Sequence, residues 1–89
     1  MKITLEISMY PLQVNYQTAI LGFIDHITRN DGLKVKVNAL STQVQGEWDE
    51  VFAAVKSGAE QFFGDAGRGS FVMKVLPGDI DLDYRHAAK

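Results

Sequence analysis

Two short segments of this sequence combine an aromatic residue with hydroxyl side chains, and the second also carries amide side chains. The first is Ser8-Met9-Tyr10-Pro11-Leu12, and the second runs from Ser41 to Asp49 (STQVQGEWD). Hydroxyl and amide groups donate and accept hydrogen bonds, and an aromatic ring offers a surface on which a planar heterocycle can stack. This combination predicts a binding site for a small molecule.

Each of these residues also has a purely structural interpretation. Tyr10 could close the end of a strand, and Trp48 could anchor the start of a helix against the sheet. Thr42 is expected to point toward the core, where a hydroxyl needs a partner that a ligand could supply. Gly46 is expected to expose backbone amides at a helix start. The candidate ligand-binding residues are Ser8, Tyr10, Asn38, Thr42, Gln45, Gly46 and Trp48.

Residues typical of catalytic or metal sites are scarce. The chain has no cysteine, and its two histidines, His26 and His86, have no carboxylate at ligand spacing. Neither a Gly-x-Ser-x-Gly sequence nor a phosphate-binding glycine loop is present. We therefore expect no catalytic residue, no metal ion and no cofactor.

Composition narrows the class of protein further. The 89 residues form one domain, 46% of them are hydrophobic, and the net charge is −2. This charge disfavours nucleic acid and anionic membranes as partners, and no apolar run approaches the roughly 20 residues that span a bilayer. No signal peptide is recognisable, so a cytoplasmic location is expected. A domain this small buries only about 60–65% of its unfolded surface, which favours a homodimer or homotetramer.

Periodicity predicts six secondary-structure elements. Residues 2–9, 33–37, 41–45 and 70–76 alternate as strands do, whereas residues 16–30 and 47–63 place apolar side chains at helical spacing. The order β-α-β-β-α-β predicts an α+β ferredoxin-like sandwich, with a four-stranded antiparallel sheet and two helices on one face. Residues 1–78 form this domain, and residues 79–89 are expected to be a loose polar tail. We further expect the first and third strands to be neighbours and to run parallel.

The sheet face opposite the helices is predicted to be mixed in character. Polar residues of the central strands, such as Thr4, Glu6 and Gln43, lie beside Tyr10, Val72 and Leu76. RNA-binding sheets carry aromatic residues at such central positions, so RNA binding is not expected. The face instead suits partial burial between subunits.

The two polar segments resemble those of the YkoF-type thiamine/hydroxymethylpyrimidine-binding family. The resemblance covers roughly residues 3–76 and rests on a Ser-x-Tyr-Pro strand end, a Ser-Thr-x-x-x-Gly segment and an Asp-x-Val helix start. The matching residues are Ser8, Tyr10, Pro11, Ser41, Thr42, Gly46, Asp49 and Val51. Members of this family have ferredoxin-like domains, in tandem in the founding type, and bind thiamine through its hydroxymethylpyrimidine part. A single-domain relative would need to dimerise to rebuild that arrangement.

The resemblance implies a non-enzymatic protein that binds thiamine or hydroxymethylpyrimidine in vitamin uptake or salvage. The ligand is expected in a cleft between sheet and helices, near the end of the first strand and the start of the second helix. Two alternatives stay open. One is an oligomeric regulatory or assembly module with an unidentified ligand. The other is a cofactor-free enzyme, which would need an acid or base in a closed cavity.

Overall fold

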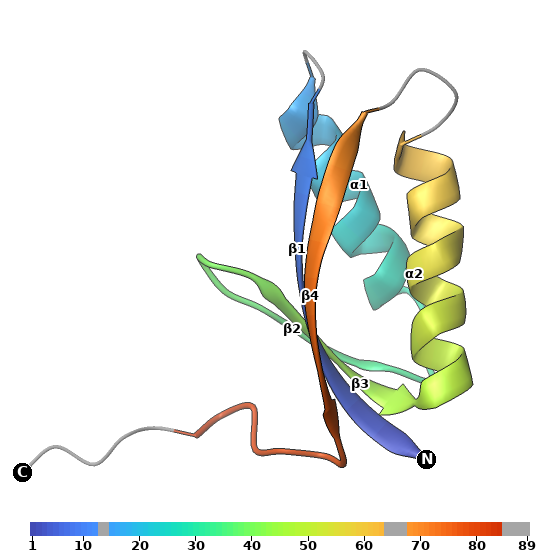
Figure 1. Ribbon diagram of the computed structural model, residues 1–89, viewed down its shortest axis with the longest axis vertical. Helices are drawn as coiled ribbons and strands as arrows, with labels where there is room; N and C mark the ends of the chain where they lie inside the picture. The colour runs from blue at the N-terminus through green and yellow to red at the C-terminus, as the bar shows by residue number, and fades with distance from the viewer. Residues whose placement is uncertain (13–14, 64–67, 85–89) are drawn as a thin grey trace, which may run out of the picture.

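Six elements build the chain in the expected order. The computed structural model describes residues 1–12, 15–63 and 68–84. The elements are β1 (Lys2–Pro11), α1 (Tyr16–Thr28), β2 (Lys34–Val37), β3 (Thr42–Glu47), α2 (Trp48–Phe63) and β4 (Gly69–Pro77). The strands form one antiparallel sheet in the order β2-β3-β1-β4, and both helices lie on the same side of it (Figure 1). The α+β ferredoxin-like prediction is confirmed.

The direction of β3 differs from our expectation. β3 is the neighbour of β1, as predicted, but the two strands are antiparallel, with Lys2 opposite Glu47 and Ile7 opposite Thr42. The right-handed crossover through α1 makes β1 parallel to β2, and the turn after β2 then reverses the chain into β3. The end of β1 therefore lies beside the start of β3, and the start of α2 lies at the other end of the sheet.

The hydrophobic core fills the space between the sheet and the helices. Strand alternation places Ile3, Leu5 and Ile7 of β1 on the face toward the helices, and all three are buried. Side chains from three other elements complete the cluster, namely Val44 of β3, Phe23 and Ile27 of α1, and Val51 and Val55 of α2. The central strand β1 thus contributes the largest share of this cluster.

The two helices approach each other closely at glycines. A Cβ atom on Gly58 of α2 would lie 2.8 Å from the ring of Phe23, and one on Gly22 of α1 would lie 2.2 Å from the ring of Phe62. Each phenyl ring therefore occupies the space left by the missing side chain on the opposite helix. This reciprocal contact fixes α1, and with it the α1 residues that face the end of β1.

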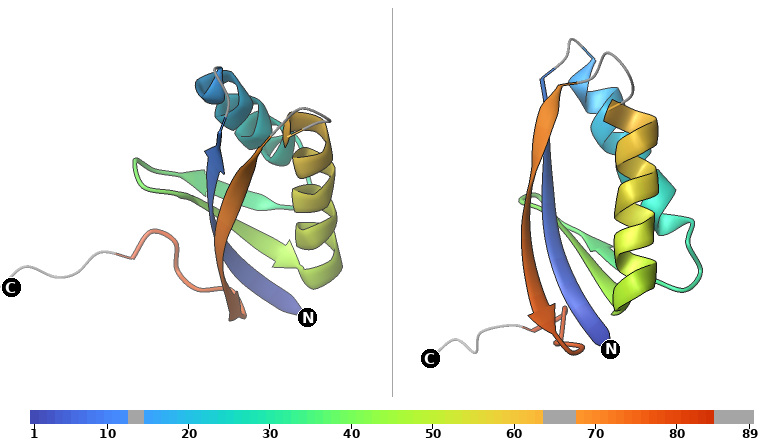
Figure 2. Two further views of the ribbon diagram at one scale, coloured as in Figure 1. Left: turned by 45° about the horizontal axis from the view of Figure 1, so that its top comes forward. Right: turned by 45° about the vertical axis from the view of Figure 1, so that its right-hand side comes forward.

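The segment after β4 crosses the sheet face that the helices leave open (Figure 2, right). Gly78 donates its N–H to the Lys2 carbonyl, Thr4 Oγ1 donates to the Gly78 carbonyl at 2.9 Å, and Asp83 pairs with Lys36 of β2. We expected residues 79–89 to be a loose tail, but residues 79–84 are held against β1, β3 and β2. Residues 85–89, including His86, lie outside the described residues.

Candidate functional site

A pocket opens where β1 continues beyond the start of β3. β1 pairs with β4 from Ile3 to Pro11, but it pairs with β3 only from Lys2 to Ile7. From Ser8 onward, the side of β1 that β3 would occupy faces the turn between β2 and β3. The space between this turn, the end of β1 and α1 is a pocket of about 220 Å³. It therefore arises from unequal strand lengths around the central strand.

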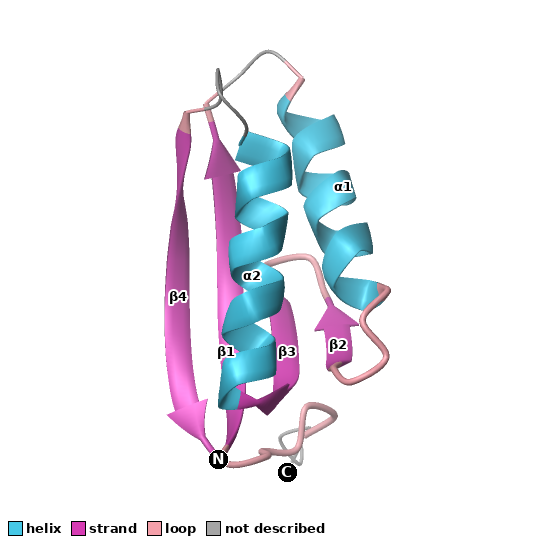
Figure 3. Ribbon diagram, turned by 90° about the vertical axis from the view of Figure 1, so that its right-hand side faces the viewer, coloured by secondary structure: helices cyan, strands magenta, loops and turns pink. Residues whose placement is uncertain are grey.

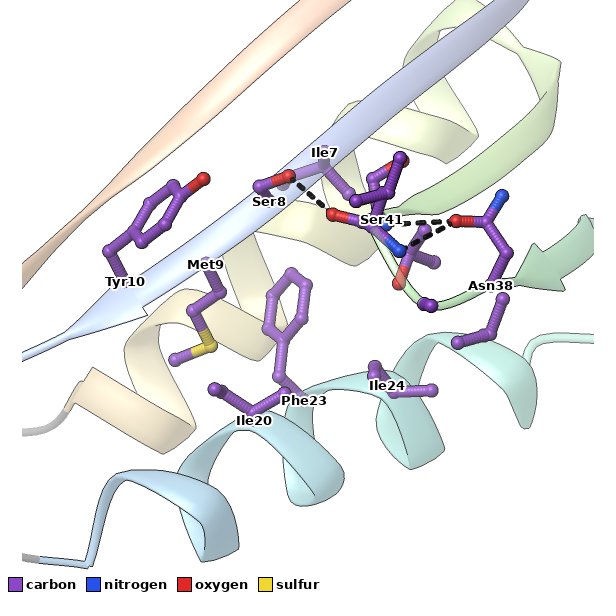
Figure 4. A pocket seen from close by; sticks show the side chains of 13 residues that line it. Ile7, Ser8, Met9, Tyr10, Ile20, Phe23, Ile24, Asn38 and Ser41 are labelled. Carbon is purple, nitrogen blue, oxygen red and sulfur yellow. Dashed lines mark hydrogen bonds between the residues drawn. The ribbon is translucent and has the colours of Figure 1, made fainter.

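The pocket has an apolar floor and a polar rim (Figure 4). Met9 and Phe23 lie between β1 and α1, and Ile20 and Ile24 of α1 line the same side. The remaining lining residues come from β1, the end of β2, the turn and the start of β3: Ile7, Ser8, Tyr10, Val37, Asn38, Ala39, Leu40, Ser41 and Thr42. An apolar surface beside convergent polar groups is the usual environment of a small organic ligand.

The Thr42 hydroxyl is the most informative polar group of this pocket. Thr42 is 5% exposed and lies opposite Ile7, so its side chain is on the helix side of the sheet. Within the part of the chain that the structure describes, its hydroxyl makes no side-chain hydrogen bond, and no fully buried side-chain oxygen or nitrogen lacks a partner. Thr42 also lines the pocket, so its hydroxyl is the candidate for a hydrogen bond to a ligand. A ligand group could satisfy it.

Asn38 has a structural role at the rim. Its side-chain oxygen accepts hydrogen bonds from the N–H groups of Leu40 (2.9 Å) and Ser41 (3.1 Å), and its amide nitrogen donates to Gln43 Oε1 at 3.3 Å. Such a bond pattern holds the backbone in a turn. Asn38 thus fixes the position of the turn relative to β1, and it shapes the rim while its own oxygen is occupied.

The polar rim continues onto the open face of the sheet. Ser8 Oγ approaches the Leu40 carbonyl at 3.5 Å, and Ser41 Oγ donates to Glu6 Oε2 at 3.1 Å. Tyr10 is half exposed and lines the same pocket. Four of the seven predicted residues, Ser8, Tyr10, Asn38 and Thr42, are therefore brought together at this end of the sheet.

The other three predicted residues, Gln45, Gly46 and Trp48, lie at the opposite end. Gln45 is 6% exposed, and its Nε2 donates to Thr4 Oγ1 at 2.9 Å and to the Ile80 carbonyl at 2.6 Å. A Cβ atom on Gly46 would lie 2.6 Å from Leu33 Cδ2, so the glycine permits close packing. The expected meeting of the end of β1 with the start of α2 is wrong, because β3 runs antiparallel to β1.

Trp48 begins α2 and packs against Phe52, with the two rings tilted and their centres 5.2 Å apart. Its indole is still 45% exposed, and it does not line the pocket at the end of β1. Its backbone N–H donates to the Met1 carbonyl. Trp48 therefore marks the end of the sheet at which β1 begins.

A second hollow, of about 330 Å³, lies near Gln45 and Gly46. Its other lining residues are Lys2, Gly32, Lys34, Asp79 and Ile80. None of the described residues that line it is aromatic, and Lys2, Lys34 and Asp79 give its lining charges of both signs. The pocket at the end of β1 combines an apolar wall with a hydroxyl that bonds to no described residue, so it is the better site for a flat, weakly polar ligand.

Sequence reasoning missed the α1 residues of the pocket. Ile20 and Ile24 belong to the apolar side chains at helical spacing within residues 16–30, but they are only half-buried, whereas Ala19, Phe23 and Ile27 are fully buried. The stripe is thus wider than the core requires. Apolar residues beside the buried stripe of a helix, beyond those that the core needs, are a signal that could have identified the pocket floor.

Charged groups lie away from this pocket. Among the described residues, no Asp, Glu, Lys, Arg or His lines it. At the opposite end of the sheet, the ammonium group of Met1 lowers the pKa of Glu47 through a hydrogen bond. On the open face, a hydrogen bond from Lys36 lowers the pKa of Asp83. The pocket can therefore bind through shape and hydrogen bonds, and its described lining supplies no carboxylate or imidazole for proton transfer.

No helix in the described part of the chain has the length and apolarity needed to cross a membrane.

Several solved structures of other proteins share this architecture. Among solved structures, a Thermotoga maritima protein assigned provisionally to thiamine biosynthesis or salvage is 24% identical, with a TM-score of 0.75 over 93% of this chain and 92% of that chain. A hypothetical protein from Methanocaldococcus jannascii is 26% identical, with a TM-score of 0.73 over 97% and 87%. A domain of unknown function from Bacillus cereus is 21% identical, with a TM-score of 0.72 over 93% and 85%.

No curated protein matches the chain. The sequence profile of the thiamine-binding protein family, in contrast, matches residues 5–85. This match includes both polar segments, the whole pocket and the segment that crosses the open face. The chain belongs to the thiamine-binding protein family.

Proposed function

We propose that this protein binds thiamine, or the hydroxymethylpyrimidine part of it, in the pocket at the end of β1, and that it acts by binding in vitamin uptake or salvage. The observation that carries the proposal is a 95%-buried Thr42 in the pocket lining, whose hydroxyl bonds to no described residue and lies beside an apolar floor, in a chain of the thiamine-binding family. The absence of carboxylates and imidazoles from the described lining supports binding over acid–base catalysis.

The size of the pocket favours one ring over two. Pockets that enclose drug-sized ligands are typically about 300–1,000 Å³, and this one is about 220 Å³. A pyrimidine ring between Phe23 and the end of β1 would place its ring nitrogens and amine near Thr42 and the rim. The thiazolium ring of thiamine would then project outward past Leu40, which is 90% exposed.

The unpaired side of β1 adds further hydrogen-bonding capacity. Beyond Ile7, β1 has no β3 partner, so backbone groups on that side face the pocket. A flat heterocycle with alternating donors and acceptors can bond to such a strand edge much as another strand would. This accounts for affinity even though the Asn38 oxygen is already occupied.

Calorimetric titration with thiamine and with free hydroxymethylpyrimidine tests the proposal. Both ligands should bind with similar affinity, because the pocket takes a single ring. Thr42→Val keeps the shape but removes the hydroxyl, and it should weaken binding by about 1–2 kcal/mol, roughly 5- to 30-fold. The matched control is Thr18→Val on the exposed side of α1, which should bind as the wild type does.

Two outcomes would redirect the assignment. No heat and no thermal shift at millimolar ligand would favour the regulatory or assembly module over a thiamine-binding role. Normal binding by Thr42→Val would place the ligand elsewhere, with the sheet face near Glu6 and Asn38 as the next site to test.

A further inference from the structure

The turn that forms one wall of the pocket lies beyond the pairing of β1 with β3. Residues 38–41 connect β2 to β3, and the last pair of the β1–β3 ladder is Ile7 with Thr42. All four residues of the turn nevertheless line the pocket, across from the end of β1. The width of the pocket therefore depends on where this turn lies relative to β1.

A set of hydrogen bonds within the β2–β3 hairpin shapes the turn. The Asn38 side-chain oxygen accepts from the N–H groups of Leu40 and Ser41, as Figure 4 shows. The Asn38 amide nitrogen donates to Gln43 Oε1 at 3.3 Å, and Gln43 Nε2 donates to Ser41 Oγ at 2.8 Å. None of these bonds reaches β1, so they fix the shape of the turn but not its distance from that strand.

Glu6 connects the turn to β1. Among the described residues, two side-chain hydrogen bonds join residues 38–41 to this strand. Ser41 Oγ donates to Glu6 Oε2 at 3.1 Å, whereas Ser8 Oγ and the Leu40 carbonyl are 3.5 Å apart, at the long limit for a hydrogen bond. A carboxylate is also a stronger acceptor than a neutral oxygen. The bond between Glu6 and Ser41 is therefore the firmer of the two.

The Glu6 side chain is on the sheet face opposite the helices. Its neighbours in β1, Leu5 and Ile7, are buried toward the helices, so strand alternation places Glu6 on the open face. In the view from the helix side, both helices lie in front of the sheet, and the open face is behind it (Figure 3). Glu6 is not among the residues that line the pocket. It can therefore shape the pocket without touching a ligand there.

Glu6 also forms an ion pair with Lys74 of β4, but this pair is weak. The charged atoms are 4.0 Å apart, and the side chains of Lys74 and Glu6 are 67% and 45% exposed. Ion pairs this exposed contribute little to stability. The structural role of Glu6 therefore depends on an acceptor oxygen at this position, and its negative charge is of secondary importance.

We propose that Glu6 is a positioning residue for the pocket, and that its hydrogen bond to Ser41 holds the turn at the distance from β1 at which the pocket accepts its ligand. Without this bond, the turn lies away from β1 in a larger share of the molecules. Affinity then falls in proportion to the binding-competent share that is lost. The inference rests on the proposed function for its ligand, but the position of the turn can be tested without thiamine.

Amide hydrogen exchange at Leu40 and Ser41 in the ligand-free protein tests the constraint on the turn. Glu6→Ala removes the acceptor, and the opening equilibrium obtained from exchange at both amides should rise by about fivefold. Glu6→Gln keeps an acceptor oxygen and should restore most of the protection. The matched control is Lys74→Met, which removes the ion pair, leaves the Ser41 bond intact and should exchange as the wild type does.

Ser41→Ala removes the same hydrogen bond from its other side. It should raise the opening equilibrium at Leu40 at least as much as Glu6→Ala does, because the bond from Gln43 is lost as well. In the Ser41→Ala background, Glu6→Ala should add less than about a twofold change, since residues that act through one bond are not additive. Circular dichroism would verify that all variants are folded. Effects that multiply independently would contradict a role of Glu6 through Ser41.

Calorimetric titration with thiamine connects the turn to the ligand. Glu6→Ala should weaken binding by about two- to fivefold, and by no more than the factor by which its opening equilibrium rises. Glu6→Gln should retain most of the affinity, and Lys74→Met should bind as the wild type does.

Three outcomes separate this inference from the proposed function. Unchanged exchange in Glu6→Ala would overturn the positioning role, and a loss of affinity in that case would mean that Glu6 contacts the ligand itself. Faster exchange with unchanged affinity would also overturn the proposal, because the turn would not limit binding. A wild type that does not bind thiamine would contradict the proposed function, while the exchange measurements would still decide whether Glu6 holds the turn.

Discussion

Thr4 and Thr42 are two buried threonines on neighbouring central strands, at opposite ends of the sheet. Thr4 is 2% exposed, and its hydroxyl donates to the Gly78 carbonyl and accepts from Gln45 Nε2 and the Ile80 N–H. Thr42 is 5% exposed, and its hydroxyl has no side-chain hydrogen bond to any described residue. The C-terminal segment of the chain thus satisfies the buried hydroxyl at one end of the sheet (the closed end), beside the hollow near Gln45 and Gly46, whereas the threonine at the other end lines a pocket. A buried hydroxyl indicates a ligand only where the chain itself leaves it unpaired.

The largest expected effect is on the closed end. Thr4→Val keeps the side-chain shape but leaves Gln45, Gly78 and Ile80 each without one partner. We expect a loss of about 2 kcal/mol in the free energy of unfolding, which lowers Tm by roughly 10 °C in a domain of this size. Thermal unfolding followed by circular dichroism measures it.

Thiamine affinity of the same variant, measured well below its Tm, should equal that of the wild type. A fall in affinity with little change in Tm would reverse the roles that we assign to the two threonines. Thr42→Val should instead change affinity and not Tm. The same substitution, Thr to Val, therefore distinguishes a structural role at one end of the sheet from a binding role at the other.

Gly46→Ala tests a second residue of the closed end. The new Cβ would crowd Leu33 Cδ2, but this atom ends a flexible side chain and can move. Overpacking costs about 1–3 kcal/mol, and the lower entropy of the unfolded chain offsets about 0.4–1 kcal/mol. We expect a net loss of about 1 kcal/mol, measured as a lower denaturation midpoint, with thiamine affinity unchanged. If affinity falls instead, the backbone amides near Gly46 contact the ligand, as the sequence first indicated.

Local periodicity was sufficient to predict most of the fold. Alternation in β1 identified which side chains face the helices, and it identified the mixed open face correctly, because burial on one face requires a period of two. We predicted the wrong direction for β3 relative to β1, because no pattern within either strand encodes it. It follows from β1 and β2 being parallel with β3 between them, which is a property of the whole sheet.

The candidate site was half predictable for the same reason. Ser8, Tyr10, Asn38 and Thr42 lie in short segments that the topology brings together. Gln45 looks equally available in the sequence, but its partner Ile80 is 35 residues away. Long-range partners of this kind decide which polar residues are free, and they are visible only once the C-terminal segment is seen to cross the sheet.

Leu40→Ser tests the open end with a smaller effect. Leu40 is 90% exposed, so the change should alter stability by less than about 0.5 kcal/mol. If the outer ring of thiamine covers about 30 Å² of this side chain, its loss weakens binding by roughly 0.5–1 kcal/mol, about two- to fivefold. Calorimetry with Leu21→Ser, an exposed leucine of α1 outside the pocket, is the control.

Free hydroxymethylpyrimidine refines this measurement. It lacks the outer ring, so Leu40→Ser should leave its affinity unchanged while that of thiamine falls. An equal loss for both ligands would mean that the pyrimidine ring itself contacts Leu40, and the orientation that we propose for thiamine would have to be reversed.

The smallest effect concerns the pair between Lys36 and Asp83, which ties the C-terminal segment to β2. Lys36 lowers the pKa of Asp83 below the ordinary 3.8, so the folded state binds the proton less tightly than the unfolded state does. The stabilisation from this pair is therefore present in full above about pH 4, and it declines as pH falls through the lowered pKa of Asp83. Because both side chains are well exposed, water and salt screen the pair, and the change in stability should be small.

Amide hydrogen exchange at Ile80 tests this. In the wild type it should accelerate below pH 3.8 beyond the intrinsic effect of pH on exchange, while in Asp83→Asn it should already be faster at pH 6. Wild-type and Asp83→Asn proteins that exchange alike at pH 6 would show that Thr4 and Gln45 hold the segment without help from this pair.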